Sequence, residues 1–226
     1  MLDKIESFLE LAKVFSSKGY SLFLVGGTVR DILLSIPLTD MDAVSDATPE
    51  EMKKFIDADF TFSKMGSVRI KYKNVKFDVT TLRKESGYID HRHPRKIEFV
   101  KDLKTDHFRR DFTLNAMYMD TRFVLYDYEG GLNDLNNGVL RMVGNPLKRL
   151  KEDPLRIIRC IRFSLIYGFS IDEKLEKALV KTAKYLKEIS KDKIKMELNK
   201  IDVSLKEKQN ELMKKYSINT FIDVIE

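Results

Sequence analysis

The N-terminal part of the chain carries apolar patterns of two kinds. Apolar residues recur at helical spacing over residues 3–17, which predicts an amphipathic helix. The short apolar run 21–25 predicts a buried strand, and the glycine pair 26–27 separates it from a predicted helix over 29–35. A second strand is predicted over 40–44. This order of elements indicates a region of mixed helix and sheet.

The middle of the chain is predicted to form strands joined by turns. Alternating apolar and polar positions over 67–72 and 75–82 predict a hairpin. The polar stretch 83–96 is predicted to be a loop. A helix is predicted over 109–117, and another strand pair around 123–128.

The pattern changes near residue 145, because the apolar positions beyond it recur only at helical spacing. The sequence therefore predicts an α+β fold in two domains. Residues 1–144 are predicted to form a head with a mixed sheet and helices. Residues 145–226 are predicted to form an all-α domain.

Composition narrows the range of function classes. The chain has 226 residues and no apolar run long enough to cross a membrane. Its single cysteine, Cys160, has no partner for an intrachain disulfide, which suits a reducing cytoplasm. One cysteine and three histidines also disfavour a structural zinc site.

The positive charge is concentrated in the C-terminal part. Residues 174–215 contain 13 lysines, no arginine and seven acidic residues, so this segment alone accounts for the chain's formal net charge of +6. A basic segment suits a polyanionic partner, because neutralising phosphates releases counterions. A solvated lysine-rich helical surface explains the same charge, and charge by itself favours that simpler explanation.

A candidate phosphate-binding turn follows the first predicted strand. Gly26 and Gly27 allow the backbone to approach a phosphate closely, and the N-terminus of the next helix offers N–H donors. Arg30 adds a fixed fork of donors for phosphate oxygens. A glycine pair alone is more often structural, so this interpretation depends on the neighbouring residues.

A pair of aspartates strengthens the interpretation. Residues two apart on a strand point to the same side, so Asp40 and Asp42 are expected to share one face. Crowded carboxylates suit Mg²⁺, and two metal ions held this way can activate an attacking hydroxyl and neutralise a leaving pyrophosphate. Asp78, on a later predicted strand, is expected to complete this catalytic group. Taken alone, the two aspartates are better explained as residues that merely flank a turn.

The predicted helix over 152–163 has one charged half. At about 100° per residue, its charged side chains fall together, and Ile157 and Ile161 fall on the opposite half, facing a core. The charged half consists of Asp153, Arg156, Arg159 and Arg162. Asp153 and Arg156 are three positions apart, so an acceptor and a donor are expected side by side. A salt-bridged amphipathic helix is the structural alternative.

Together these motifs resemble a known family. The run Gly-Gly-Thr-Val-Arg-Asp at 26–31, followed by Asp-Met-Asp at 40–42, is similar to the head of class II tRNA nucleotidyltransferases and bacterial poly(A) polymerases. The resemblance continues in family order through DHRHP (90–94), RRDFTLNAM (109–117), YEGG (128–131) and EDPLRIIRCIRF (152–163). It implies a nucleotidyltransferase head of the polymerase β type for residues 1–144. For residues 145–226 it implies a helical neck and the start of a body, with roles in nucleotide selection and RNA contact.

The resemblance also implies roles for individual residues. In the family the second glycine and the arginine of the first motif hold the triphosphate, which implies Gly27 and Arg30. The two aspartates bind the metal ions, which implies Asp40 and Asp42 as Mg²⁺ ligands. The second arginine of the RRD motif contacts the nucleotide, which implies Arg110.

The remaining implied contacts concern the sugar and the base. Asp111 and Asn115 are implied to order the sugar and its surroundings, and Arg159 and Arg162 match positions that reach the nucleotide. Cytosine and adenine each present an amino donor beside a ring-nitrogen acceptor, which suits the acid–arginine pair at 153 and 156. Uracil and guanine present the opposite polarity. In the family this pair acts as a protein template for CTP and ATP.

These features predict an enzyme that adds CCA to tRNA 3′ ends from CTP and ATP. Residues 83–108 correspond to the family's flexible loop, with Tyr88, Asp90, Arg92 and Pro94 in matching places, which favours addition of CCA over CC alone. Two alternatives stay open: a poly(A) polymerase of the same superfamily, and a non-catalytic RNA-binding remnant. Base hydrogen bonding does not separate CCA addition from poly(A) addition.

The chain departs from the family pattern at several positions. Ser35 stands where glycine is usual, His107 where leucine is common, and Tyr128-Glu129 where Pro-Phe is frequent. Lys193 stands near the usual place of a neck arginine, and lysine lacks the planar donor fork. The family usually carries further helical domains that grip the tRNA.

Overall fold

The computed structural model describes residues 2–88 and 94–222, and its contacts divide the chain into two compact units. The units are residues 1–85, 96–110 and 114–132, and residues 86–95, 111–113 and 133–226. Residues 133–144 thus belong to the second of these units. The domain boundary predicted at 144/145 stays a prediction. In the part of the chain that is described, no helix combines the length and apolar character needed to cross a membrane.

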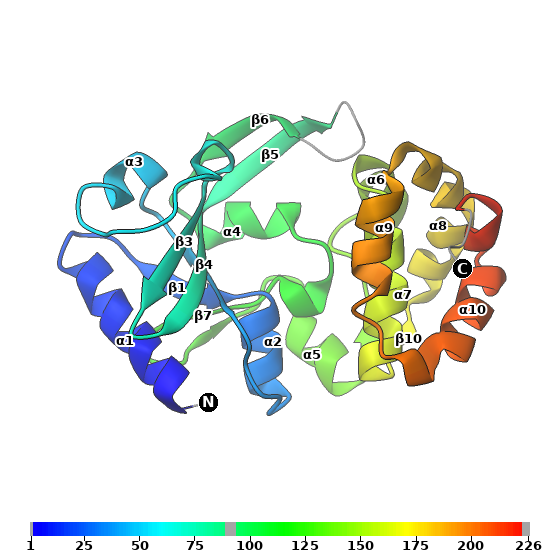
Figure 1. The fold of residues 1–226 in the computed structure, drawn as a ribbon, viewed down its shortest axis with the longest axis horizontal. Helices are drawn as coiled ribbons and strands as arrows, with labels where there is room; N and C mark the ends of the chain where they lie inside the picture. Colours follow the sequence, from blue (N-terminus) through cyan, green and yellow to red (C-terminus); the bar gives the residue numbers. More distant parts are fainter. Residues whose placement is uncertain (1, 89–93, 223–226) are drawn as a thin grey trace. The chain divides into compact units, whose positions relative to one another are not determined.

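A six-stranded mixed sheet forms the first unit, with the strand order β3-β4-β2-β1-β7-β8 (Figure 1). Its strands are β1 (Leu22–Val25), β2 (Met41–Ser45), β3 (Ser67–Tyr72), β4 (Val75–Thr81), β7 (Tyr118–Met119) and β8 (Leu125–Tyr126). Strands β2 and β4 are parallel, whereas the other neighbouring pairs are antiparallel. The mixed sheet and the hairpin predicted for residues 67–82 are confirmed.

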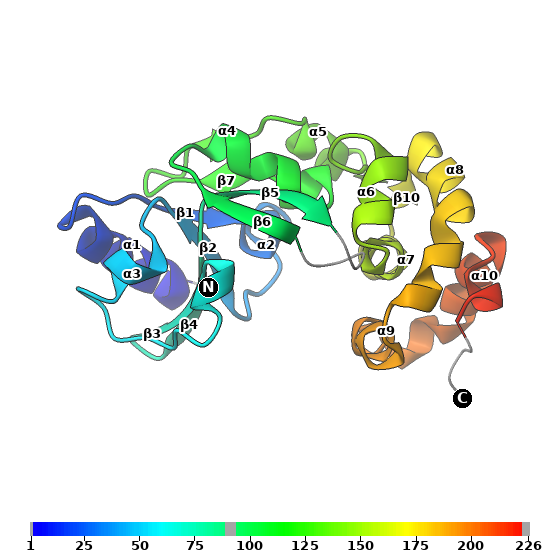
Figure 2. The same cartoon turned by 90° about the horizontal axis from the view of Figure 1, so that it is seen from above.

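Helix α1 (Leu2–Ser16) packs beside β1 and confirms the first predicted helix (Figures 1 and 2). Its core side chains Phe8, Leu11 and Phe15 recur at helical spacing and have no exposed surface. The other helical elements of this unit are α2 (Gly27–Leu33), α3 (Pro49–Met52), α4 (Leu103–Asp106) and the 3-10 turns Ser63–Met65 and His107–Arg109.

The loop predicted over 83–96 is wrong. Strands β5 (Arg83–Tyr88) and β6 (Pro94–Phe99) form a separate two-stranded sheet. Their side chains are exposed or half-buried, so neither strand has the buried apolar alternation by which a sequence reveals a strand. The predicted loop residues Asp90 and Arg92 lie outside the described residues.

The continuous helix predicted over 109–117 is also wrong. This segment contains parts of two short 3-10 turns, and Arg110 between them is extended with ψ 160°. The backbone makes long-range bonds instead, because the Thr113 N–H donates to the Arg141 carbonyl at 2.9 Å. Pairing with a distant segment thus replaces the hydrogen bonds of a helix.

The second unit is built mainly from helices, which confirms the helical neck. Its helices are α6 (Pro146–Glu152), α7 (Leu155–Tyr167), α8 (Glu173–Thr182), α9 (Lys191–Leu198) and α10 (Lys206–Lys215). The 3-10 turn Thr113–Asn115 and helix α5 (Gly131–Asn136) each include residues of both units, and later 3-10 turns are Ala183–Glu188, Val203–Leu205 and Ile218–Thr220. The expectation of helices alone beyond residue 146 needs one correction, because β10 (Ser170–Ile171) pairs in parallel with β9 (Val139–Leu140).

The helix predicted over 152–163 is interrupted at Asp153. Helix α6 ends at the residue before it, and Asp153 is extended with φ −147° and ψ 93°. Pro154 explains the break, because its ring disfavours a helical conformation at the preceding residue and it has no N–H to donate. Ile157 and Ile161 on α7 are fully buried, as predicted.

Candidate active site

Two carboxylates lie next to each other on parallel strands of the first unit. Asp42 on β2 is in register with Asp78 on β4, and neighbouring strands are about 4.8 Å apart. Burial raises the pKa of the Asp42 carboxyl above its usual value; Arg110 opposes this shift, and Asp78 adds to it. Two hard oxygen donors that disfavour each other's charge fit a divalent cation such as Mg²⁺.

Asp40 lies one residue before the strand. Strand β2 begins at Met41, and Asp40 forms an exposed bend. Strand alternation therefore does not place Asp40 on the face of Asp42, and joint metal binding by these two residues stays a prediction. Among residues 2–88 and 94–222, no group of three Asp, Glu, His or Cys side chains is close enough together to hold a metal ion.

The glycine turn leaves room for the Asp42 carboxylate. Gly26 has φ 62°, a conformation that favours glycine, and α2 begins directly after it, two residues earlier than predicted. A Cβ on Gly27 would lie 3.1 Å from Asp42 Oδ2 and 3.4 Å from Arg30 Nη2. Thr28 fixes the strand on the same side, because its Oγ1 accepts a hydrogen bond of 2.7 Å from the Asp42 N–H.

Two predicted arginines and Asn115 gather at the same turn. Arg30 is buried, and its Nη1 donates to Asn115 Oδ1 at 2.7 Å. A Cβ on Gly26 would lie 3.7 Å from both Arg110 Nη1 and Asp42 Oδ2, and 3.9 Å from the Asn115 carbonyl oxygen. The structure thus brings together seven of the residues that the sequence assigned to catalysis and nucleotide binding: Gly26, Gly27, Arg30, Asp42, Asp78, Arg110 and Asn115.

A buried carboxylate absent from the sequence predictions holds Arg110. Asp106 has no exposed surface, and its Oδ2 accepts hydrogen bonds from Arg110 Nη2 at 3.0 Å and from the Tyr118 hydroxyl at 2.8 Å. Its Oδ1 accepts from Arg109 Nε at 2.7 Å and from the Arg83 N–H at 3.0 Å. Burial alone would raise the pKa of Asp106, but Arg109 and Arg110 hold it well below its usual value. Asp106 is therefore ionised and fixes the orientation of the Arg110 guanidinium.

Two arginines of α7 are paired with acidic residues inside the second unit. Arg159 donates to Asp111 Oδ2 through Nε at 2.8 Å and Nη2 at 2.5 Å. Arg162 Nε lies 2.9 Å from Glu197 Oε2 on α9. Burial alone would lower the pKa of Arg159, but Asp111 raises it above its usual value. Both arginines are therefore charged and held in defined positions.

Asp153 and Arg156 remain close despite the helix break. Arg156 Nε lies 3.9 Å from Asp153 Oδ2. Arg156 Nη1 also donates to the Arg149 carbonyl at 2.8 Å, and Asp153 Oδ1 accepts from the Leu155 N–H at 3.1 Å. The predicted acceptor and donor thus lie side by side, although a turn rather than helical spacing places them. Their contact with a base stays a prediction.

A family model described as the poly(A) polymerase head domain matches residues 22–141, just over half of the chain. The chain belongs to this family. The matched part of the poly(A) polymerase head includes Asp42, Asp78 and Arg110, and the resemblance noted from the sequence motifs is confirmed.

Similar proteins agree with the assignment to the poly(A) polymerase head family. The CCA-adding enzyme of Staphylococcus epidermidis is 38% identical over 201 residues, covering 88% of this chain and 50% of the relative. That of Lactobacillus helveticus is 38% identical over 196 residues, covering 86% of this chain and 49% of the relative. This chain therefore spans about half the length of the curated relatives it matches.

Solved structures share the fold. A Bacillus stearothermophilus CCA-adding enzyme in complex with CTP aligns with a TM-score of 0.79 and 33% identity, covering 86% of this chain and 47% of that chain. A Thermotoga maritima CCA-adding enzyme complexed with tRNA aligns with a TM-score of 0.76 and 27% identity, covering 95% of this chain and 51% of that chain. The nucleotidyltransferase fold predicted for the head is confirmed.

The two glycines of the head are expected to respond differently to alanine. Gly26→Ala should lower the free energy of unfolding by about 1–2 kcal/mol, because an L side chain at φ 62° is strained. Gly27→Ala should leave it nearly unchanged, because Gly27 is helical and only the Asp42 side chain has to give way by a few tenths of an ångström. Urea unfolding of both variants checks this contrast, and equal losses of stability would contradict it.

Removing the charge of Asp106 should destabilise the head in a pH-dependent way. Asp106→Asn should lower the free energy of unfolding at pH 7 by about 3 kcal/mol, because it removes the buried negative charge that pairs with Arg109 and Arg110. The folded-state pKa of Asp106 is depressed, so its contribution is present above the unfolded pKa of about 3.9 and is lost below it. Urea unfolding should therefore show a difference from the unmodified protein that narrows below about pH 4. Asp57→Asn, at an exposed position, is the matched control and should change little at either pH.

Proposed function

We propose that this chain adds CCA to tRNA 3′ ends from CTP and ATP, as a template-independent RNA nucleotidyltransferase. The observation that carries the proposal is the cluster of Asp42 and Asp78 with Gly26, Gly27 and Arg110 in a poly(A) polymerase head. Solved relatives support the substrates. They are described as a CCA-adding enzyme in complex with CTP, one complexed with tRNA, and a tRNA nucleotidyltransferase complexed with a primer tRNA and an incoming ATP analogue.

In the proposed reaction, the acceptor 3′-hydroxyl oxygen attacks the α-phosphorus of the nucleotide. A phosphodiester bond forms, the bond to pyrophosphate breaks, and the hydroxyl proton is released to water. Gly26 and Gly27 allow close approach of the phosphates, and Arg30 and Arg110 donate to their oxygens. Mg²⁺ held by Asp40 and Asp42, with Asp78 adjacent, would neutralise charge on the pyrophosphate and favour ionisation of the hydroxyl.

The second unit carries the residues proposed to select the base. Asp153 accepts a hydrogen from the amino group of cytosine or adenine, and Arg156 donates to the neighbouring ring nitrogen. Arg159 and Arg162, fixed by their acidic partners, supply further donors to the nucleotide. Asn115, in the first unit, and Asp111 order the sugar.

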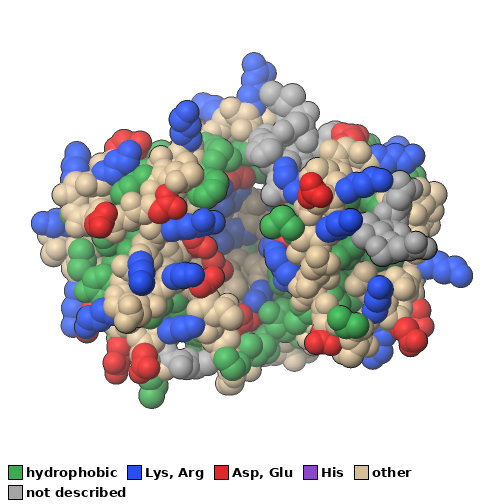
Figure 3. Space-filling model, in the orientation of Figure 1, with side chains coloured by type: hydrophobic (Ala, Val, Ile, Leu, Met, Phe, Trp, Pro, Cys, Tyr) green, Lys and Arg blue, Asp and Glu red, His purple; other side chains and the backbone are tan. Residues whose placement is uncertain are grey.

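The lysine-rich helices are proposed to add affinity for the RNA backbone. The basic residues of α9 and α10 are all lysines, and basic side chains are dispersed over the face that these helices present in Figure 3 rather than gathered in one patch. Such charge attracts phosphates without reading sequence. We also propose a cytoplasmic location, supported by the single, buried cysteine.

An incorporation assay tests the proposed function. A tRNA lacking its terminal CCA should gain C, C and A and then stop when CTP and ATP are supplied with Mg²⁺. Asp42→Asn should reduce incorporation by at least about 100-fold, because it removes a charge from the candidate metal site. It should still bind CTP, as measured by calorimetry. Asp57→Asn, at an exposed position, is the control and should retain activity.

The same assay separates the alternatives. Continued addition of A from ATP alone would indicate a poly(A) polymerase. Binding of tRNA without any incorporation would indicate a non-catalytic RNA-binding protein. Full activity of Asp42→Asn would contradict the assignment of the catalytic carboxylate.

Loss of the Asp153 carboxylate should reduce base discrimination. Asp153→Ala should lower the preference for CTP over UTP, expressed as a ratio of kcat/KM values, by roughly 10-fold, since one bidentate base contact contributes about 1–3 kcal/mol. Asp192→Ala removes an exposed acid from α9 and should leave the ratio unchanged. Steady-state kinetics with each of the four nucleoside triphosphates checks both variants, and an unchanged ratio in Asp153→Ala would exclude the acid from base selection.

A further inference from the structure

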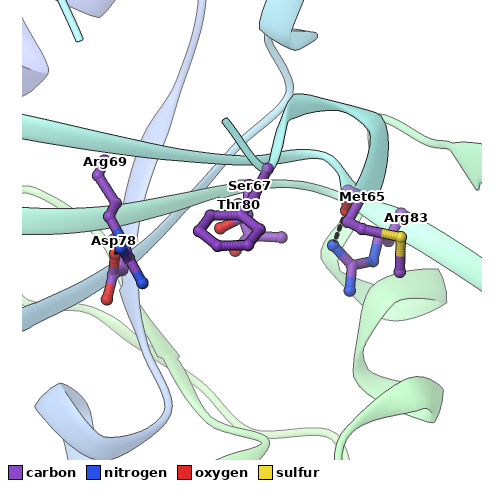
Figure 4. Close-up of a pocket in the computed structure, with 7 residues that line it drawn as sticks. Met65, Ser67, Arg69, Asp78, Thr80 and Arg83 are labelled. Carbon is purple, nitrogen blue, oxygen red and sulfur yellow. Dashed lines mark hydrogen bonds and ion pairs between the residues drawn. The ribbon is translucent and has the colours of Figure 1, made fainter. Parts of the chain in front are cut away.

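A polar pocket with an aromatic wall lies beside the catalytic carboxylates. It has a volume of about 320 Å³ and is formed by β3, β4, the start of β5 and the turn that precedes β3 (Figure 4). Figure 4 shows Arg69 and Asp78 together at one end, Met65 and Arg83 at the other, and Ser67 and Thr80 between them. None of the functional assignments above uses this pocket, except for its edge at Asp78.

Strand register places the pocket on the same face of the sheet as the catalytic carboxylates. Arg69 pairs with Asp78 and Ser67 with Thr80 across β3 and β4, and Asp78 pairs with Asp42 across β4 and β2. Directly paired residues on neighbouring strands point to the same face. The pocket is therefore continuous with the carboxylate pair.

The strand order puts the pocket and the glycine turn on opposite sides of Asp42. Strand β2 has two neighbours, β1 and β4. Strand β1 leads directly into Gly26 and Gly27, whereas β4 carries Asp78 at the edge of the pocket. A group bound at the glycine turn and a group bound in the pocket would thus approach Asp42 from opposite directions.

This arrangement matches the demand of the proposed reaction. In an in-line displacement the attacking and leaving oxygens stand on opposite sides of phosphorus. If the triphosphate, and with it the leaving pyrophosphate, lies at the glycine turn, the attacking hydroxyl has to come from the side of Asp78. We propose that the pocket binds the terminal nucleotide of the RNA acceptor, with its base stacked on Phe62. This assignment rests on the proposed function.

The lining residues have the chemistry that a single-stranded RNA end requires. Phe62 is 47% exposed, so its ring is available for stacking with a base. The Arg69 guanidinium carbon lies 5.0 Å from the centre of that ring, and Arg69 Nε lies 3.3 Å from Asp78 Oδ1 in an exposed ion pair. The Arg69 side chain is 59% exposed, so its other guanidinium nitrogens can donate to a phosphate next to the stacked base. The hydroxyls of Ser67 and Thr80 are suited to hydrogen bonding with a ribose.

The aromatic wall is held in place by the backbone. The Met65 N–H donates to the Phe62 carbonyl at 2.9 Å within a 3-10 turn, and the Thr81 N–H donates to the Gly66 carbonyl at 2.7 Å. The Arg83 side chain donates to the Met65 carbonyl (Figure 4). The segment carrying Phe62 is thereby tied to β4 and to the strand that follows, so the pocket is preformed.

Removal of the aromatic wall tests the proposal. Phe62→Ala should raise the KM for the RNA acceptor by about 5- to 150-fold, the range that loss of one base–aromatic stack produces. The KM for CTP and the melting temperature should stay unchanged, because Phe62 is half exposed and lies away from the glycine turn. Phe62→Tyr should restore the KM for RNA. Phe123→Ala is the matched control, because Phe123 is also 47% exposed but does not line the pocket.

A fluorescence measurement tests the pocket without turnover. An RNA acceptor ending in 2-aminopurine should lose fluorescence when it binds the unmodified protein, because the base stacks on Phe62, and should lose much less with Phe62→Ala. An RNA carrying 2-aminopurine in its interior should show no difference between the two proteins. Equal quenching of the terminal base, or an unchanged KM for RNA in Phe62→Ala, would overturn the assignment of the pocket.

The incorporation assay and the fluorescence measurement test the proposed function and the assignment of the pocket separately. Absence of incorporation by the unmodified protein would contradict the nucleotidyl transfer, while quenching that depends on Phe62 would still assign the pocket to an RNA 3′ end. If the protein incorporates nucleotides but neither the KM for RNA nor the quenching depends on Phe62, the proposed function stands and the assignment of the pocket is wrong. A DNA oligonucleotide quenched as strongly as the RNA would exclude a role of the ribose hydroxyl in recognition.

Discussion

The placement of Asp42 beside Asp78 on parallel strands is the constraint on which the head depends. Two carboxylates at this spacing, one of them half-buried, raise the free energy of the ionised state unless positive charge lies near. Arg110 and Arg30 supply that charge. The glycine turn leaves space for these groups, because a Cβ at Gly26 would meet Arg110 and Asp42, and a Cβ at Gly27 would meet Asp42 and Arg30. The buried Asp106 then balances the charge of Arg110 and sets its direction. The carboxylate pair thus requires the two arginines, and Arg110 in turn requires Asp106 as its partner.

Two of the departures of this chain from the family pattern are structurally connected. His107 stands in place of leucine and Tyr128-Glu129 in place of Pro-Phe, and these residues touch one another. His107 Nε2 lies 2.9 Å from Glu129 Oε1, and the His107 and Tyr128 ring centres are 5.3 Å apart. A hydrogen bond and a ring contact therefore link these three residues, and His107 directly follows Asp106 in the chain. Ser35 differs from these three, because it adopts φ 56°, where the glycine usual in the family has no strain.

The sequence predicts those parts of the fold and site that depend on local patterns. The first helix, the glycine turn and the 67–82 hairpin follow from apolar periodicity and turn residues. Asp153 and Arg156 lie close together as predicted, but a turn and not the predicted helical spacing brings them together. The strands over 83–99 were missed because their side chains are mostly exposed, and the 109–117 segment because its hydrogen bonds go to residues near 141. Asp106 was missed for a related reason. An acid three and four positions before two arginines is common on helix surfaces, and only tertiary burial shows that it is a buried partner.

The helix predicted over 152–163 is broken at Asp153, yet Asp153 and Arg156 lie close together as predicted. If the helix were continuous, the orientation of Asp153 relative to Arg156 would vary with the rotamers of both side chains. Pro154 instead fixes Asp153 in an extended conformation, and its Oδ1 is held by the Leu155 N–H. Arg156 is buried and is anchored on the Arg149 carbonyl. In the proposed contact with a base, an acceptor and a donor fixed in this way would lose little side-chain freedom, so more of the hydrogen-bond energy would remain available to distinguish one base from another.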